Sequence, residues 1–150
     1  MIFLKTDEEV ELMRQSNILL GKTFAELAKV IKPGVTTAEL DKVAYEFIMD
    51  NGGKPSCLGY EGYPATLCTS VNEQVVHGIP SDKVVLKDGD IISVDSCILL
   101  NGFHSDSAYT FPVGDVKPEV MQLLRTTKEA LYLGIEQAIT GRRLGDIGAT

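Results

Sequence analysis

The feature that most constrains the fold is an Asn101-Gly102 pair between two runs rich in β-branched and apolar residues. This dipeptide is the strongest short-range signal for a β-hairpin with a two-residue turn. With that turn, Asp106 lies opposite Cys97, and Asp95 becomes a diagonal neighbour of Asp106 on the same face, about 7–8 Å away or less at Cβ. Two converging carboxylates are typical ligands of one or two divalent cations, so the hairpin predicts a metal site.

The same register sorts the side chains of the hairpin onto two faces, because strand side chains alternate. One face is polar and carries Ser93, Asp95, Cys97, His104, Asp106 and Thr110. The other is mainly apolar and carries Ile92, Val94, Ile98, Leu100, Phe103, Tyr109 and Phe111, with three serines among them. A solvent-facing polar strand surface explains the first face equally well at this point, and a β-bulge would break the pairing.

Helix and strand signals surround the hairpin. Capping boxes at Thr6–Glu9 and Thr36–Glu39 predict two helices, which end at Pro33-Gly34 and Gly52-Gly53. Two short apolar runs, 65–71 and 74–79, predict strands. A third helix with an apolar stripe is expected from Pro118 to about residue 140, followed by another helix with Asp146 as its N-cap.

Composition restricts the classes of function. The chain has 150 residues, which is enough for one domain with a core, and its net charge of −7 makes direct nucleic-acid binding a poor hypothesis. There is no apolar run of membrane-spanning length and no secretory signal. The three cysteines (Cys57, Cys68 and Cys97) form no CxxC pair, which favours a reduced, cytoplasmic setting over a cysteine-ligated zinc site.

Several spaced motifs together resemble one family. They are Pro55-Ser-Cys57-Leu-Gly-Tyr60, Asn72-Glu-Gln-Val-Val-His77-Gly-Ile-Pro80, Lys87-Asp-Gly-Asp-Ile91 and Asn101-Gly-Phe-His-Ser-Asp106. In this order they resemble type I methionine aminopeptidase over essentially the whole chain. The resemblance implies an α+β, pita-bread (creatinase/aminopeptidase-like) fold, of which the chain is the N-terminal half, an antiparallel sheet covered by helices. Residues 1–150 are then expected to be the N-terminal portion of a single catalytic domain, incomplete at the C-terminus.

The resemblance also implies a role for individual residues. Asp95 matches a bidentate carboxylate on one metal, and Asp106 matches the carboxylate that bridges two divalent ions (Co, Mn, Fe or Zn). His77 matches a catalytic histidine that contacts the scissile peptide nitrogen or stabilises the tetrahedral intermediate, and it also contacts substrate. The positions that match the lining of the methionine side-chain pocket are Cys57, Tyr60, Tyr63 and Cys68. His104 is expected to be a neighbour of the site and not a ligand.

The function that the resemblance implies is removal of the initiator methionine from nascent peptides with a small second residue, near the ribosome. The peptide carbonyl would be attacked by metal-activated hydroxide. The family's other ligands, one His and two Glu, come from a C-terminal half, so we expect little or no activity from these 150 residues alone. The alternatives are a non-catalytic pita-bread half-domain that binds a peptide or protein, and an enzyme acting on X-Pro bonds, which the methionine-type pocket disfavours.

Overall fold

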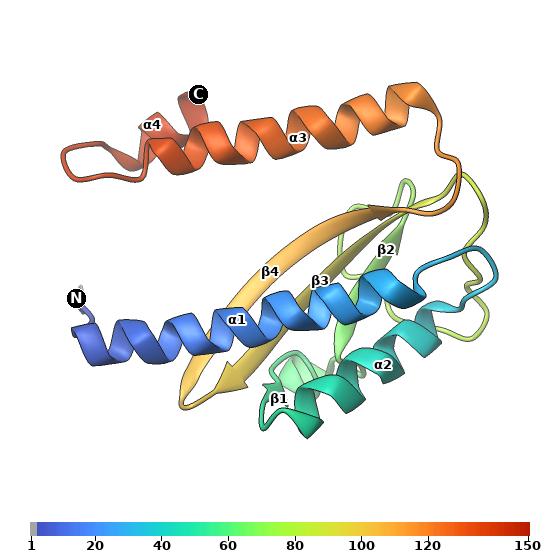
Figure 1. Ribbon diagram of the computed structural model, residues 1–150, viewed down its shortest axis with the longest axis horizontal. Helices are drawn as coiled ribbons and strands as arrows, with labels where there is room; N and C mark the ends of the chain where they lie inside the picture. The colour runs from blue at the N-terminus through green and yellow to red at the C-terminus, as the bar shows by residue number, and fades with distance from the viewer. Residues whose placement is uncertain (1–2) are drawn as a thin grey trace. The chain divides into compact units, whose positions relative to one another are not determined.

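The computed structural model describes residues 3–150, and these divide between Asp115 and Val116 into two compact units. The elements of the first unit are α1 (Asp7–Val30), α2 (Thr37–Asp50), β1 (Lys54–Pro55), the 3-10 helix η1 (Tyr60–Gly62), β2 (Leu67–Val71), β3 (Ile91–Leu100) and β4 (Phe103–Pro112) (Figure 1). The second unit contains α3 (Pro118–Glu136) and α4 (Leu144–Ala149).

The hairpin forms in the predicted register. β3 and β4 pair antiparallel without interruption from Ile91–Pro112 to Leu100–Phe103, which places Cys97 opposite Asp106. Asn101 and Gly102 both have positive φ, 54° and 82°, as a type I′ turn requires. On its other side β3 pairs with β1 and β2, also antiparallel. β3 therefore lies inside the sheet, where pairing on both sides holds its backbone.

The two long helices cover one face of this sheet. Figure 1 shows α1 lying along the β3–β4 hairpin with α2 beside it. The core that they share with the sheet contains the fully buried side chains Leu20, Leu27, Leu40, Ile48, Leu67, Ile92, Val94 and Ile98. Because side chains alternate along β3, burial of this face turns Asp95 and Cys97 to the opposite face. The candidate metal ligands thus lie on the sheet face that α1 and α2 leave uncovered.

Both predicted capping boxes are present. The Thr6 N–H donates to Glu9 Oε2 at 2.8 Å, and the Glu9 N–H donates to Thr6 Oγ1 at 3.2 Å. Thr36 and Glu39 make the equivalent pair at 2.7 and 3.1 Å. These bonds satisfy backbone donors that the first helical turn leaves free, so each helix begins where its local sequence predicts.

The prediction of a strand at 74–79 was wrong. The segment is a loop, because Asn72 and His77 have positive φ (52° and 58°) and an extended strand cannot accommodate that conformation. Its apolar side chains are outside the core, and Val75 is 85% exposed. The loop is instead attached to β2 through backbone contacts of Gly78. An apolar run was therefore not sufficient evidence for a strand.

The second unit also differs from expectation in detail. α3 ends at Glu136, short of residue 140, and Arg143 is the N-cap of α4 in place of Asp146. The Asp146 carboxylate reaches back to accept the Arg143 N–H at 2.8 Å, which is the N3 role in a capping box. Gly134 of α3 is buried, and a Cβ added there would lie 3.4 Å from Ile147 of α4.

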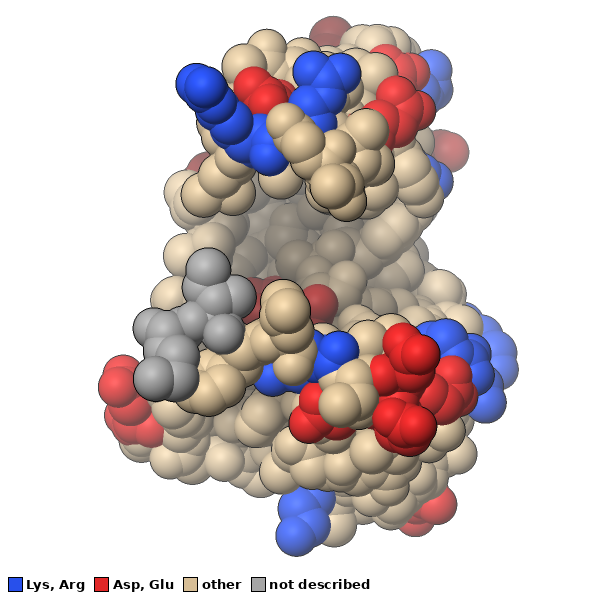
Figure 2. Space-filling view, turned by 90° about the vertical axis from the view of Figure 1, so that its left-hand side faces the viewer, with Lys and Arg blue, Asp and Glu red and all other residues tan. Residues whose placement is uncertain are grey.

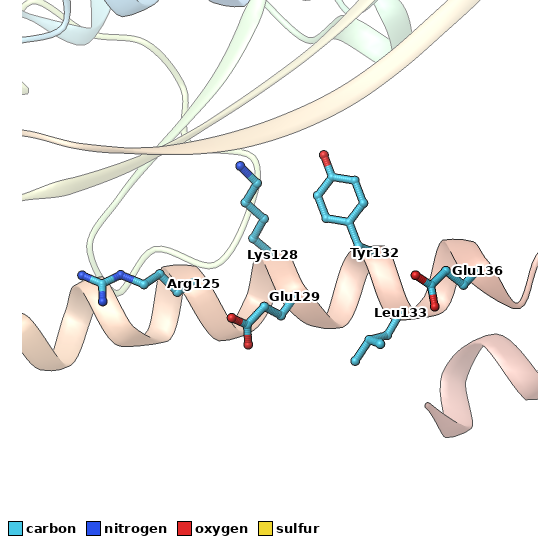
Figure 3. A pocket seen from close by; sticks show the side chains of 6 residues that line it. All are labelled: Arg125, Lys128, Glu129, Tyr132, Leu133 and Glu136. Carbon is cyan, nitrogen blue, oxygen red and sulfur yellow. The ribbon is translucent and has the colours of Figure 1, made fainter.

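Much of the predicted apolar stripe of α3 is exposed, including Leu123, Leu131 and Ile135. A hollow of about 510 Å³ on this helix is lined by Arg125, Lys128, Glu129, Tyr132, Leu133 and Glu136 (Figure 3). All six residues belong to one helix, and the two glutamates are accompanied by two cations and by apolar side chains. We assign no chemistry to this hollow.

Acidic residues outnumber basic ones in this chain, which has a net charge of −7. On the face drawn in Figure 2, acidic and basic side chains are interspersed, and no continuous basic patch is visible among the described residues. Within residues 3–150, no helix combines the length and the apolar character needed to cross a membrane.

Candidate metal centre

Three potential ligand atoms meet on the uncovered face of the sheet. One carboxylate oxygen each from Asp95 and Asp106 and the sulfur of Cys97 all lie within 4.8 Å of one another. Asp95 and Cys97 are half-buried on β3, whereas Asp106 is exposed on β4. The hairpin register alone produces this arrangement, because Cys97 and Asp106 are paired residues and Asp95 is the diagonal neighbour.

The electrostatics of the centre favour a bound cation. Burial raises the pKa of Asp95, and the negative charge of Asp106 raises it further, with His77 acting in the opposite direction. Burial also raises the pKa of Cys97, as does a hydrogen bond with Asp106. Negative groups in close proximity repel one another, and a divalent cation between them would remove that penalty. The donor set therefore fits a divalent metal.

His77 approaches the centre through the loop at 74–79. Its charge influences Asp95, 18 positions later in the chain, although its side chain is exposed. The next residue, Gly78, is buried: its N–H donates to Ser70 Oγ at 3.2 Å, and its carbonyl accepts the Thr69 N–H at 2.7 Å. These bonds attach the residue after His77 to β2, the strand that pairs with β3 at Asp95.

Three of the four predicted pocket residues lie together beside this centre. Cys68 on β2 is the pairing partner of Asp95 on β3. Tyr63 donates a hydrogen bond to the Leu67 carbonyl at 2.9 Å, one residue before Cys68. Burial raises the pKa of its phenol, and so do the nearby Cys68 and, through its charge, Cys57. Tyr60 differs, since it lies on η1 with 69% of its surface exposed. The structure therefore groups Cys57, Tyr63 and Cys68 and leaves Tyr60 open to solvent.

The hydrogen-bond partner of His104 is Ser56. Its Nδ1 lies 2.9 Å from Ser56 Oγ, in the segment that follows β1. The three-residue ligand group does not include it. Its role as a neighbour of the site stays a prediction.

Asp41 was not singled out from the sequence. This α2 residue accepts hydrogen bonds from the backbone N–H groups of Thr66 (2.9 Å) and Leu67 (2.8 Å), and so holds the start of β2, the strand of Cys68. Burial raises the pKa of its carboxyl, although the two hydrogen bonds act in the opposite direction. Its position on α2, distant in sequence from β2, offered no local signal.

We expect Asp41→Ala to destabilise the fold by roughly 1–3 kcal/mol, because it leaves two partly buried N–H donors without an acceptor. Asp41→Asn keeps an acceptor oxygen and removes a charge that burial penalises, so it should lie close to wild type. Urea unfolding followed by circular dichroism measures both. Equal losses for the two variants would show that the charge, and not the pair of hydrogen bonds, is what matters.

Comparisons with known proteins agree with this geometry. Residues 11–150 match the model of metallopeptidase family M24. The chain is 50% identical over 147 residues to the methionine aminopeptidase of Clostridium acetobutylicum and 48% identical over 147 residues to methionine aminopeptidase 1 of Bacillus subtilis. In both cases the alignment covers 98% of this chain and 59% of the relative. The chain thus spans about three-fifths of the length of these relatives.

Solved structures extend the comparison to the fold. The methionine aminopeptidase from Rickettsia prowazekii superposes with a TM-score of 0.96 at 38% identity, covering 99% of this chain and 59% of that one. A prolidase from Pyrococcus furiosus superposes with a TM-score of 0.80 at 21% identity, over 96% of this chain and 41% of that one, and shows likeness of fold only.

The fold and the two facing carboxylates place the chain among the pita-bread α+β proteins, the fold shared by methionine aminopeptidases and prolidases. The predicted fold class is therefore confirmed. More particularly, the chain belongs to metallopeptidase family M24, and its resemblance to the methionine aminopeptidases is confirmed. Use of a divalent metal follows from membership of a metallopeptidase family.

Proposed function

We propose that the protein carrying this chain is a methionine aminopeptidase that removes the initiator methionine from peptides with a small second residue. The observation that carries the proposal is the convergence of Asp95 and Asp106, with Cys68 paired to Asp95 on the neighbouring strand, in a chain 50% identical to a methionine aminopeptidase. We further propose that residues 1–150 form the N-terminal portion of a single catalytic domain.

Asp95 and Asp106 would hold the divalent metal, for which we propose two ions. When bound, the ions would polarise the peptide carbonyl and provide a nucleophile from water at neutral pH. Co, Mn, Fe and Zn all fit carboxylate ligands. The partial burial of Asp95 strengthens its attraction for a cation, since the local dielectric is lower than that of water.

His77 would bind the substrate at the scissile peptide. The left-handed backbone at this residue and the bonds of Gly78 to β2 restrain the loop that carries the imidazole, and a positive charge on His77 lowers the pKa of Asp95. An imidazole can donate a hydrogen bond to charge that develops on the reacting peptide, so its role is electrostatic stabilisation or proton transfer.

The substrate methionine would lie against Cys57, Tyr63 and Cys68, with the more exposed Tyr60 at the rim. A flexible thioether makes favourable contacts with aromatic rings and other polarizable groups, which suits this set of side chains. The Tyr63 hydroxyl is engaged by the Leu67 and Gly78 carbonyls at 2.9 and 3.2 Å, so its ring is held in place.

The setting follows from the substrate. Nascent peptides emerge at the ribosome, so we propose a cytoplasmic enzyme that acts near it without binding nucleic acid directly. The net charge of −7 supports the second part, because phosphate backbones attract basic surfaces.

The test is release of free methionine from Met-Ala-Ser and from Met-Ile-Ser by the intact protein, with Mn²⁺ or Co²⁺ added. We expect cleavage of Met-Ala-Ser only, and loss of that cleavage in Asp106→Asn. Equal cleavage of both peptides would contradict the proposed selectivity for a small second residue. Metal binding and peptide binding without any cleavage would favour a non-catalytic peptide-binding role.

A further inference from the structure

The third member of the ligand group, Cys97, has no role in the function proposed above. It lies on β3 two residues after Asp95, points to the same face, and is paired with Asp106. Its sulfur and one oxygen from each carboxylate are mutually within 4.8 Å, and this group contains neither Cys57 nor Cys68. Among the three cysteines, only Cys97 therefore has the position of a ligand to a metal between the two aspartates.

The backbone holds this thiol rigidly. Cys97 pairs with Asp106 of β4 on one side, and on the other its carbonyl accepts the Ser56 N–H at 2.8 Å. A side chain on a strand paired on both sides is positioned more precisely than one on a loop. Cys57, by contrast, lies in the loop after β1.

The distances allow the thiol to become a ligand. The Cys97 sulfur lies within 4.8 Å of one oxygen of each carboxylate. A thiol gives up its proton to solvent when it binds a metal. Metal–sulfur and metal–oxygen bonds of about 2.3 and 2.0–2.2 Å place two ligands of one tetrahedral ion about 3.5 Å apart. The ligand atoms here are up to 4.8 Å apart. Rotation of the exposed Asp106 side chain can bring its oxygen to the shorter separation that one ion requires.

We propose that Cys97 is a thiolate ligand of the metal held by Asp95 and Asp106. The centre is then a mixed carboxylate–thiolate site. A thiolate favours Zn²⁺ and Co²⁺ over Mn²⁺, because Mn²⁺ prefers oxygen ligands. The inference rests on the proposed metal site, but it does not require the aminopeptidase reaction.

The test is Co²⁺ titration of the intact protein, followed by its absorption spectrum. Coordination by Cys97 gives a thiolate-to-cobalt charge-transfer band in the near ultraviolet. We expect this band in the wild type, in Cys57→Ser and in Cys68→Ser, and its loss in Cys97→Ser. Zn²⁺ affinity should fall at least about 10-fold in Cys97→Ser, while Mn²⁺ affinity changes little, since only the softer ion gains from sulfur.

A second measurement uses the wild type alone, in case Cys97→Ser does not fold. Zn²⁺ should protect Cys97 from alkylation by iodoacetamide, as mapped by mass spectrometry, more strongly than it protects Cys57. Co²⁺ binding without the charge-transfer band, or a band that persists in Cys97→Ser, would overturn the role of Cys97 and leave the metal site standing. Absence of Co²⁺ binding to the wild type would overturn both proposals.

Discussion

Asp106→Asn is expected to lower the affinity for divalent metal by more than about 100-fold, since loss of a residue that only supports a metal ligand already costs 10–100-fold. The substitution removes the negative charge and one of the converging carboxylates while keeping the size of the side chain. Equilibrium dialysis against Mn²⁺ or Co²⁺ measures the effect directly. The matched control is Asp82→Asn, which removes the same negative charge from an exposed residue in a turn. This variant should bind metal as the wild type does.

The effect of Asp106→Asn can also be measured in the metal-free protein, through the pKa of Asp95. Asp106 contributes to the raised pKa of Asp95, so its replacement should let the pKa of Asp95 fall towards the ordinary range for a carboxyl. A carboxyl NMR titration detects that change and also shows that the hairpin is intact. Wild-type metal affinity in a folded Asp106→Asn protein would remove Asp106 from the set of metal ligands.

Gly78→Ala should have the second large effect. A Cβ at this position would lie 2.1 Å from the Thr69 carbonyl oxygen and 2.6 Å from its carbon, and both are backbone atoms of β2. The loop must therefore move away from β2, which we expect to cost about 1–3 kcal/mol of stability and to displace His77 from Asp95. Thermal unfolding and kcat/KM on Met-Ala-Ser measure the two consequences.

Gly21→Ala is the matched control for that substitution. Gly21 lies on α1, where an added Cβ meets nothing within 4 Å, so alanine should stabilise the helix by about 0.4–1 kcal/mol. The two variants thus make the same chemical change with opposite expected signs. A Gly78→Ala protein as stable as the wild type would mean that the close approach to Thr69 does not determine the loop.

Local chemistry in the sequence was enough to predict the hairpin and the starts of α1 and α2. The Asn101-Gly102 turn set the register, and the register placed Asp95 and Asp106 on one face and Ile92 and Val94 on the other. The capping boxes likewise involve residues three apart. In each case the interacting groups are close in the chain or related by a single tight turn, so no knowledge of distant contacts was needed.

Tertiary structure decided how the remaining groups meet. The apolar run at 74–79 predicted a strand, but the segment is a loop in which His77 has a positive φ and Gly78 is bonded to β2. Asp41 reaches β2 from α2, and the Ser56 N–H, one residue before Cys57, donates to the Cys97 carbonyl of β3. The sequence by itself determined the two carboxylates and their face, because alternation and the turn are local rules. Which thiol, histidine and helix residue join them depended on backbone contacts between distant segments, which no local pattern encodes.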